Sequence, residues 1–104
     1  MPSIKMLGKS YTVDDEGFLD SKHSWSHEWA EERAKQLDIT LTGEHWRVIV
    51  YLRKYTDDYG IAPLVNMVCV ELGIPMLRMV EMFGELPLRN ASRIAGLERP
   101  TGCI

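Results

Sequence analysis

The sequence predicts a small, mainly helical α+β domain with an N-terminal β-hairpin, a helix-turn-helix-like element and a flexible C-terminal arm. After residue 24, apolar residues recur every three or four positions in several segments, as they do on the buried face of a helix. Glycine and proline separate these segments, as is typical of helix ends and turns. A chain of 104 residues is long enough for one domain with a modest hydrophobic core.

The hairpin is expected over residues 4–13, as two short strands about a turn at Gly8 and Lys9. An isolated hairpin is marginally stable in water, so it must pack on another part of the chain. Residues 14–24 form a polar connector, of which residues 17–19 (GFL) are expected to enter the core.

Two longer helices are expected next. Ser24 or Ser26 can cap the first, which runs to about Leu37, and Thr42 can cap the second, which continues to Tyr59. The buried face of the first is expected to hold Trp25, Trp29, Arg33 or Ala34, and Leu37, and that of the second Trp46, Ile49, Val50 and Arg53.

Three shorter helices complete the predicted domain. Pro63 is expected to open one that Gly73 closes, and Pro75 starts another over residues 76–83. The expected buried stripe of the first of these consists of Leu64, Val65, Val68, Cys69 and Leu72. A last helix covers residues 88–95, after which Gly96 releases the tail, so we divide the chain into a domain of residues 1–95 and an arm of residues 96–104.

Composition excludes several classes of function. The net charge of −3 gives no basic balance for a dedicated nucleic-acid binder. Two cysteines cannot build a disulfide framework or a complete zinc site, so we expect neither a metal nor a cofactor. The chain has no membrane-span pattern and no signal-peptide pattern, which predicts a cytoplasmic protein without a membrane partner.

The two cysteines are expected in different environments. Cys69 falls on a predicted apolar stripe, where a buried thiol is inert. Cys103 follows Pro100, Thr101 and Gly102 in the tail, where a thiolate has the access that sulfur transfer requires. The alternative is that Cys103 is an exposed thiol without a function.

Residues 93–104 (RIAGLERPTGCI) resemble the C-terminal arm of the DsrC/TusE family, which includes the gamma subunit of dissimilatory sulfite reductase. The resemblance extends over nearly the whole chain. Further matching segments are residues 15–19 (DEGFL), 41–46 (LTGEHW), 51–53 (YLR), the 60–63 turn and a degraded motif at 82–87 (MFGELP).

The resemblance implies that Cys103 carries sulfur as a persulfide. It also implies that a second arm cysteine, present in members that serve sulfite reductase, is replaced here by Ser92. A serine cannot form the bridge between two arm cysteines, so the chain looks like a single-cysteine relay protein. Arg93 and Arg99, together with residues 100–102, are expected to dock the arm on partners.

The leading hypothesis is therefore a sulfur carrier rather than a stand-alone enzyme. Its partners would be sulfur-donor and sulfur-acceptor proteins, such as a sulfur-relay complex with a tRNA thiolase, or a sulfite reductase. Two alternatives stay open: a gamma-subunit-like modulator of sulfite reductase, and a helix-turn-helix DNA-binding regulator with Asn66, Arg78 and Arg89 as contacts. His45 and Trp46 lie in a family motif, but capping and burial explain them, so we assign them no catalytic role.

Overall fold

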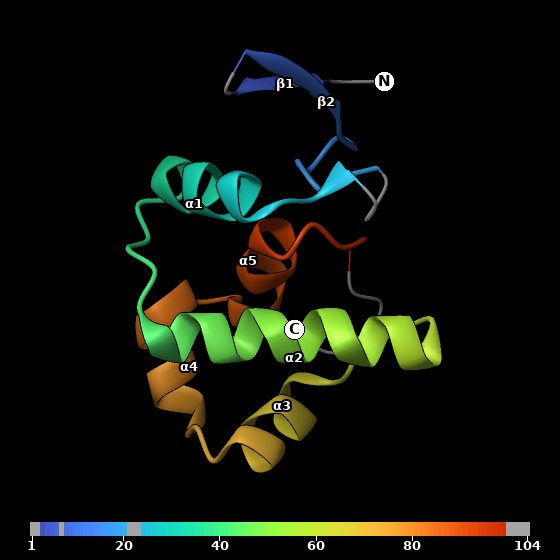
Figure 1. Ribbon diagram of the computed structural model, residues 1–104. Helices are drawn as coiled ribbons and strands as arrows, with labels where there is room; N and C mark the ends of the chain where they lie inside the picture. Colours follow the sequence, from blue (N-terminus) through green and yellow to red (C-terminus); the bar gives the residue numbers. More distant parts are fainter. Residues whose placement is uncertain (1–2, 7, 21–23, 100–104) are drawn as a thin grey trace.

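The computed structural model describes residues 3–6, 8–20 and 24–99. Within these residues the fold is mainly helical, as the sequence predicts, with a two-stranded antiparallel hairpin at one end (Figure 1). The elements in chain order are β1 (Ser3–Met6), β2 (Lys9–Thr12), α1 (His27–Gln36), α2 (Gly43–Tyr59), α3 (Val65–Leu72), α4 (Met76–Phe83) and α5 (Pro87–Ile94).

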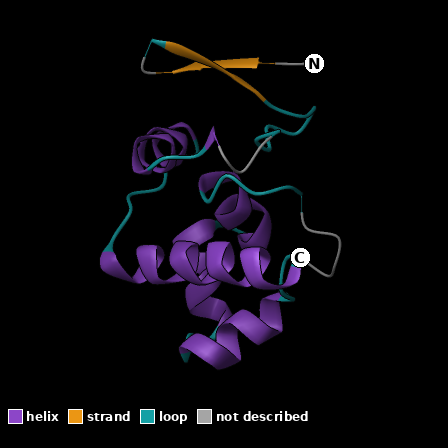
Figure 2. Ribbon diagram, turned by 45° about the vertical axis from the view of Figure 1, so that its right-hand side comes forward, coloured by secondary structure: helices purple, strands orange, loops and turns teal. Residues whose placement is uncertain are grey.

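The hairpin is shifted slightly from the predicted turn. Met6 pairs with Lys9, so Lys9 belongs to β2, and Gly8 lies in the turn with a φ of 75°. The hairpin is the outermost layer and lies over α1 (Figure 2). Tyr11 of β2 packs edge-on against Trp29 of α1, with ring centroids 4.9 Å apart. This contact belongs to a small second core that gives the hairpin the packing it needs.

The helix ends follow local signals in the sequence. Ser26 caps α1 by accepting the Trp29 N–H at 3.2 Å. Thr42 is the N-cap of α2, and its backbone N–H donates to Nδ1 of His45 at 3.1 Å. Gly60 ends α2 in the left-handed conformation, which glycine adopts without a steric cost. These three positions confirm the predicted boundaries.

Pro63 does not open α3, contrary to the prediction. Leu64 is the N-cap residue and has an extended backbone with ψ at 149°, so Pro63 lies before the helix and is buried. Leu64 itself is 52% exposed and does not belong to the buried stripe. The predicted stripe is therefore wrong at Leu64, while Val65 and Val68 are buried and Cys69 packs against the core.

The buried face of α2 also differs from the prediction. Val50 is 61% exposed, whereas Val48, Ile49 and Leu52 are fully buried. The prediction is therefore wrong at Val50, while Ile49 is fully buried and Trp46 packs against the core as expected. Val48, Ile49 and Val50 are consecutive apolar residues, so periodicity alone does not decide which of them is covered.

Helix α5 occupies the centre of the molecule. It contacts α1, α2 and α4, and Figure 1 shows it between α1 on one side and α2 on the other. Its apolar residues are fully buried, among them Leu88, Ala91 and Ile94. The chain leaves the domain from the end of this central helix, so the packing of α5 sets the starting point of the C-terminal arm.

Candidate functional site at the base of the arm

The C-terminal end of α5 is held by side chains from three other parts of the chain. Carbonyl groups at a helix end lack partners within the helix. Here three successive carbonyl oxygens each accept a side-chain N–H. The donors and acceptors are Trp29 Nε1 to Arg93 at 2.9 Å, Trp25 Nε1 to Ile94 at 2.9 Å and Arg53 Nη1 to Ala95 at 2.7 Å.

These donors also support one another. The Arg53 guanidinium lies over the Trp25 ring, 4.1 Å from its centroid, in a cation–π contact. Burial lowers the pKa of Arg53 from its ordinary value, while Asp57 acts in the opposite direction. We call Trp25, Trp29 and Arg53 the arm anchor.

The chain remains packed for two residues beyond the helix cap at Ala95. Gly96 has a φ of 69°, and a Cβ at this position would lie 2.4 Å from Cδ1 of Trp25. Leu97 is 2% exposed, and its N–H donates to the Ser92 carbonyl at 3.0 Å. The exposed chain begins at Glu98.

A turn in the connector, at residues 14–18, lies next to the end of α5 and completes this site. Asp14 Oδ1 accepts the backbone N–H groups of Glu16 and Phe18 at 2.9 and 3.0 Å. Gly17 has a φ of 83°, and the Arg33 guanidinium fills the space beside it, with Nη2 donating to the Gly17 carbonyl at 3.2 Å. Phe18 is 1% exposed, which confirms that this segment enters the core.

Arginines from α5 and from the arm bind this turn. Arg93 Nε donates to the Glu16 carbonyl at 2.9 Å, and its guanidinium lies over the Phe18 ring. The Glu16 carboxylate accepts from Arg89 at 2.9 Å and, through its other oxygen, from Arg99. Glu16 thus links the connector, α5 and the start of the arm.

Arg93 has internal partners on each side of its guanidinium. Besides its contacts with residues 16 and 18, Nη1 donates to Asn90 at 2.8 Å. Burial lowers the pKa of Arg93, and the nearby Glu16 opposes that shift. The contacts that the structure gives Arg93 therefore hold the domain together, and its predicted docking of partners stays a prediction.

Ser92 lies on the buried side of α5 and is 0% exposed. Its hydroxyl has no hydrogen-bond partner among the described residues. A buried hydroxyl without a partner carries an uncompensated desolvation cost. The position where the resemblance implies a second cysteine is therefore enclosed by the domain rather than exposed on the arm.

The remaining predicted site residues divide into two groups. Arg99 is 56% exposed in its side chain and contacts Glu16. Pro100, Thr101, Gly102 and Cys103 lie outside the described residues. Cys69, the cysteine that the structure describes, is a free thiol and half-buried against the core.

The sequence alone did not predict the contacts that Trp25, Trp29, Arg53 and Glu16 make at this site. One signal was present, because Arg53 falls on the face of α2 that was expected to be buried. An arginine on such a face needs a polar partner, and the structure supplies the Ala95 carbonyl.

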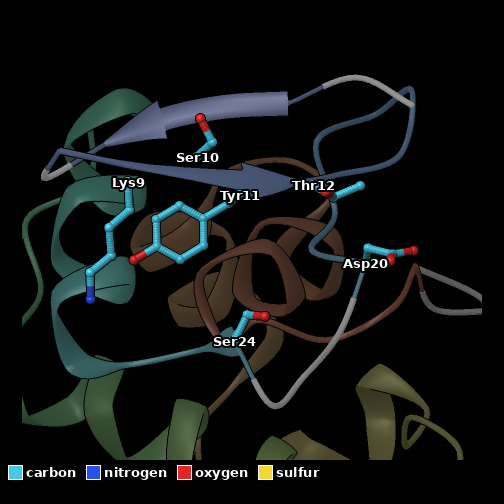
Figure 3. Close-up of a pocket in the computed structure, with 6 residues that line it drawn as sticks. All are labelled: Lys9, Ser10, Tyr11, Thr12, Asp20 and Ser24. Atoms are coloured by element: carbon cyan, nitrogen blue, oxygen red, sulfur yellow. The ribbon is translucent and has the colours of Figure 1, made fainter.

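A separate pocket of about 360 Å³ lies under the hairpin, and Figure 3 shows the residues that line it. Its lining residues are Lys9, Ser10, Tyr11, Thr12, Asp20 and Ser24. In this view Lys9 and Asp20 lie at opposite ends of the pocket. The pocket includes no residue of the predicted arm site, and we assign it no function.

The arginines suggested as DNA contacts have carboxylate partners. Arg78 of α4 donates to Glu44 at 2.8 and 3.0 Å and lies 3.6 Å from Glu81. Arg89 is bound to Glu16. Each guanidinium is thus paired with a carboxylate of the domain, which does not favour phosphate binding by these arginines.

Comparison with known proteins identifies the family. Residues 5–104 match the family model described as "DsrC like protein". The chain belongs to the DsrC family. Among curated relatives, the gamma subunit of dissimilatory-type sulfite reductase from Nitratidesulfovibrio vulgaris is 33% identical over the full length of both chains. Sulfurtransferase TusE from Buchnera aphidicola is 34% identical and aligns with 88% of this chain and 86% of its own.

Solved structures of DsrC proteins share the fold. The oxidized gamma subunit from Archaeoglobus fulgidus superposes with a TM-score of 0.86 at 38% identity, over 99% of this chain and all of that one. The Allochromatium vinosum DsrC structure gives a TM-score of 0.86 at 36% identity, over 98% and 97% of the two chains. The helical domain with its small hairpin is therefore the DsrC fold.

Proposed function

We propose that this protein is a sulfur carrier that holds sulfur as a persulfide on Cys103. Membership of the DsrC family supports this role, as do full-length relatives named as a sulfurtransferase and as a sulfite reductase subunit. The observation that carries the proposal furthest is the construction of the arm base. The central helix α5 leads directly to the segment that carries this cysteine, and three long-range hydrogen bonds fix the end of that helix.

The chemistry needs no cofactor. The Cys103 thiolate attacks the outer sulfur of a donor persulfide, R–S–SH. A new S–S bond forms on Cys103 as the donor S–S bond breaks, and the donor leaves as the thiolate R–S⁻. An acceptor thiolate then takes the outer sulfur in the same way, so neither transfer requires an oxidant or a reductant.

The single-cysteine arm favours transfer between proteins. Ser92 cannot form a bridge with Cys103, and its side chain is enclosed in the core. The outer sulfur must therefore leave Cys103 by attack from another molecule. We propose that Arg99 and residues 100–102 contact the partner when the arm is bound. We also propose that residues 96–104 act as the arm of the domain 1–95, with Gly96 and Leu97 packed on the domain and the exposed part beginning at Glu98.

The partners we propose are a sulfur donor and a sulfur acceptor, in a relay toward tRNA thiolation or in a sulfite reductase system. No helix among the described residues is long and apolar enough to cross a membrane, and we propose that the protein works in the cytoplasm.

Sulfur labelling combined with affinity capture tests this proposal. A cysteine desulfurase supplied with radiolabelled cysteine should label the wild type and Cys69→Ala, and a reductant should remove the label. Labelling of Cys103→Ser to the same level would overturn the proposal. Capture of a tRNA thiolase or of a sirohaem sulfite reductase by the tagged full chain would then separate the two pathways.

A further inference from the structure

The end of α5 is held by side-chain hydrogen bonds in addition to the packing of its buried residues. Its three anchoring donors come from the segment before α1, from α1 and from α2. Two of them are buried or half-buried indoles, whose rigid rings have few rotamers to lose. A charged donor, Arg53, holds the last of the three carbonyls, and hydrogen bonds to charged groups are stronger than neutral ones.

The anchored carbonyls lie directly before the exit of the arm. Ala95 is followed by Gly96, which the Trp25 ring covers, and by the buried Leu97. Cys103 lies six positions beyond Leu97 in the sequence, a span of roughly 20 Å when the chain is extended. With so short a tether, the position and direction of its fixed end decide which places the thiol can reach.

We propose that Trp25, Trp29 and Arg53 are positioning residues for sulfur transfer, because they fix the point and direction from which the Cys103 arm leaves the domain. This inference rests on the proposed function. Loosening the anchor frees the last turn of α5 and lengthens the effective tether. The thiol then samples a larger volume, and its effective concentration at a partner site falls.

The Arg53→Met variant tests this inference, because methionine keeps much of the apolar stem but removes the donor to Ala95. Arg47→Met is the matched control. Arg47 also lies on α2 and also donates to a helix-end carbonyl, that of Leu72 at 3.1 Å, away from the arm. Trp25→Phe offers a second test, since it keeps an aromatic ring under Arg53 while removing the indole N–H.

Two nitroxide labels report the position of the arm. One is attached to Cys103 and one to Val50→Cys on the exposed side of α2, in a Cys69→Ala background. Double electron–electron resonance should give a broader distance distribution in Arg53→Met and in Trp25→Phe than in the wild type or Arg47→Met. Arg53→Lys, which can still donate to the carbonyl, should restore much of the narrower distribution.

A second measurement separates positioning from a purely structural contribution. Hydrogen exchange of the Leu97 amide should accelerate at least several-fold in Arg53→Met and stay near wild type in Arg47→Met, with both variants folded by circular dichroism. Persulfide loading of Cys103 by sodium polysulfide should be unchanged in all of them. Unchanged distance distributions and Leu97 exchange in folded anchor variants would overturn the inference, whereas failed loading of the wild type would overturn the proposed function instead.

Discussion

The Trp25 ring lies so close to Gly96 that any side chain at residue 96 would collide with it. An added Cβ would lie 2.4 Å from Cδ1 and 2.7 Å from Cγ. The same indole donates to the Ile94 carbonyl and supports Arg53. The indole therefore cannot retreat without breaking the contacts that hold the end of α5.

Gly96→Ala should consequently destabilise the domain strongly. The substitution combines a positive φ with a collision against a ring that has little room to move, so we expect a loss of about 2 kcal/mol or more in the free energy of unfolding. Urea denaturation measures this loss.

Gly73→Ala is the matched control for this prediction. Its φ of 65° is close to the 69° of Gly96, but an added Cβ at Gly73 meets no atom within 4 Å. We expect a loss of about 1 kcal/mol from backbone strain alone. Equal losses in the two variants would show that contact with Trp25 contributes nothing.

Ser92→Ala should leave stability unchanged or raise it by up to about 1 kcal/mol. The serine hydroxyl is buried without a described partner, so alanine removes an uncompensated polar group and creates only a very small cavity. Thermal and urea unfolding measure the change. A clear loss of stability would mean that the hydroxyl makes a hydrogen bond in solution.

Glu16 should couple more strongly to Arg89 than to Arg99. In the Arg89–Glu16 pair both side chains are largely covered, with exposed fractions of 28% and 29%. The Arg99 side chain, by contrast, is 56% exposed. Double-mutant cycles with Glu16→Gln should give coupling energies of at most about 1 kcal/mol for Arg99, falling as salt is added. A larger, salt-independent coupling with Arg99 would contradict this ranking.

Stability should fall in alkaline solution in part because of Tyr51. Burial raises the pKa of Tyr51, and Glu71, Tyr55 and Tyr59 add to the rise. As the pH rises, the Tyr51 hydroxyl therefore loses its proton first in the unfolded chain, at a pH of about 10. The contribution of Tyr51 to folding stability is present below that pH and is lost as the pH rises through the pKa of the folded protein.

Urea unfolding of the wild type and Tyr51→Phe across this pH range isolates the effect. The wild type should lose more stability between pH 9 and pH 11, values that span the ordinary tyrosine pKa of about 10. If the free energy of unfolding falls in parallel with pH for the two proteins, Tyr51 is not a cause of the alkaline loss of stability.

Local signals in the sequence predicted several helix ends correctly, although not the start of α3. Ser26, Thr42 and Gly60 act at the helix ends where their own chemistry places them. The hairpin and the entry of Phe18 into the core followed from short patterns of the same kind. The buried face of α2 was harder to predict from the sequence. Val48, Ile49, Val50 and Leu52 are all apolar, and tertiary contacts decide which of them is covered.

The arm anchor could not be predicted from spacing. Trp25 and Ile94 are 69 positions apart, and Trp29 and Arg93 are 64 apart. Such contacts exist only once α1, α2 and α5 have packed. The tail motif, by contrast, was visible in the sequence, since it depends on adjacent residues and a family resemblance.

Intact-mass measurement after treatment with polysulfide tests the central claim most directly. The wild type and Cys69→Ser should each gain one sulfur atom that a reductant removes, because Cys103 remains in both, and Cys103→Ser should gain none. Fragment masses should place the added sulfur on Cys103. Reductant-labile sulfur on Cys103→Ser, or its loss in Cys69→Ser, would contradict the assignment of Cys103 as the sulfur-carrying residue.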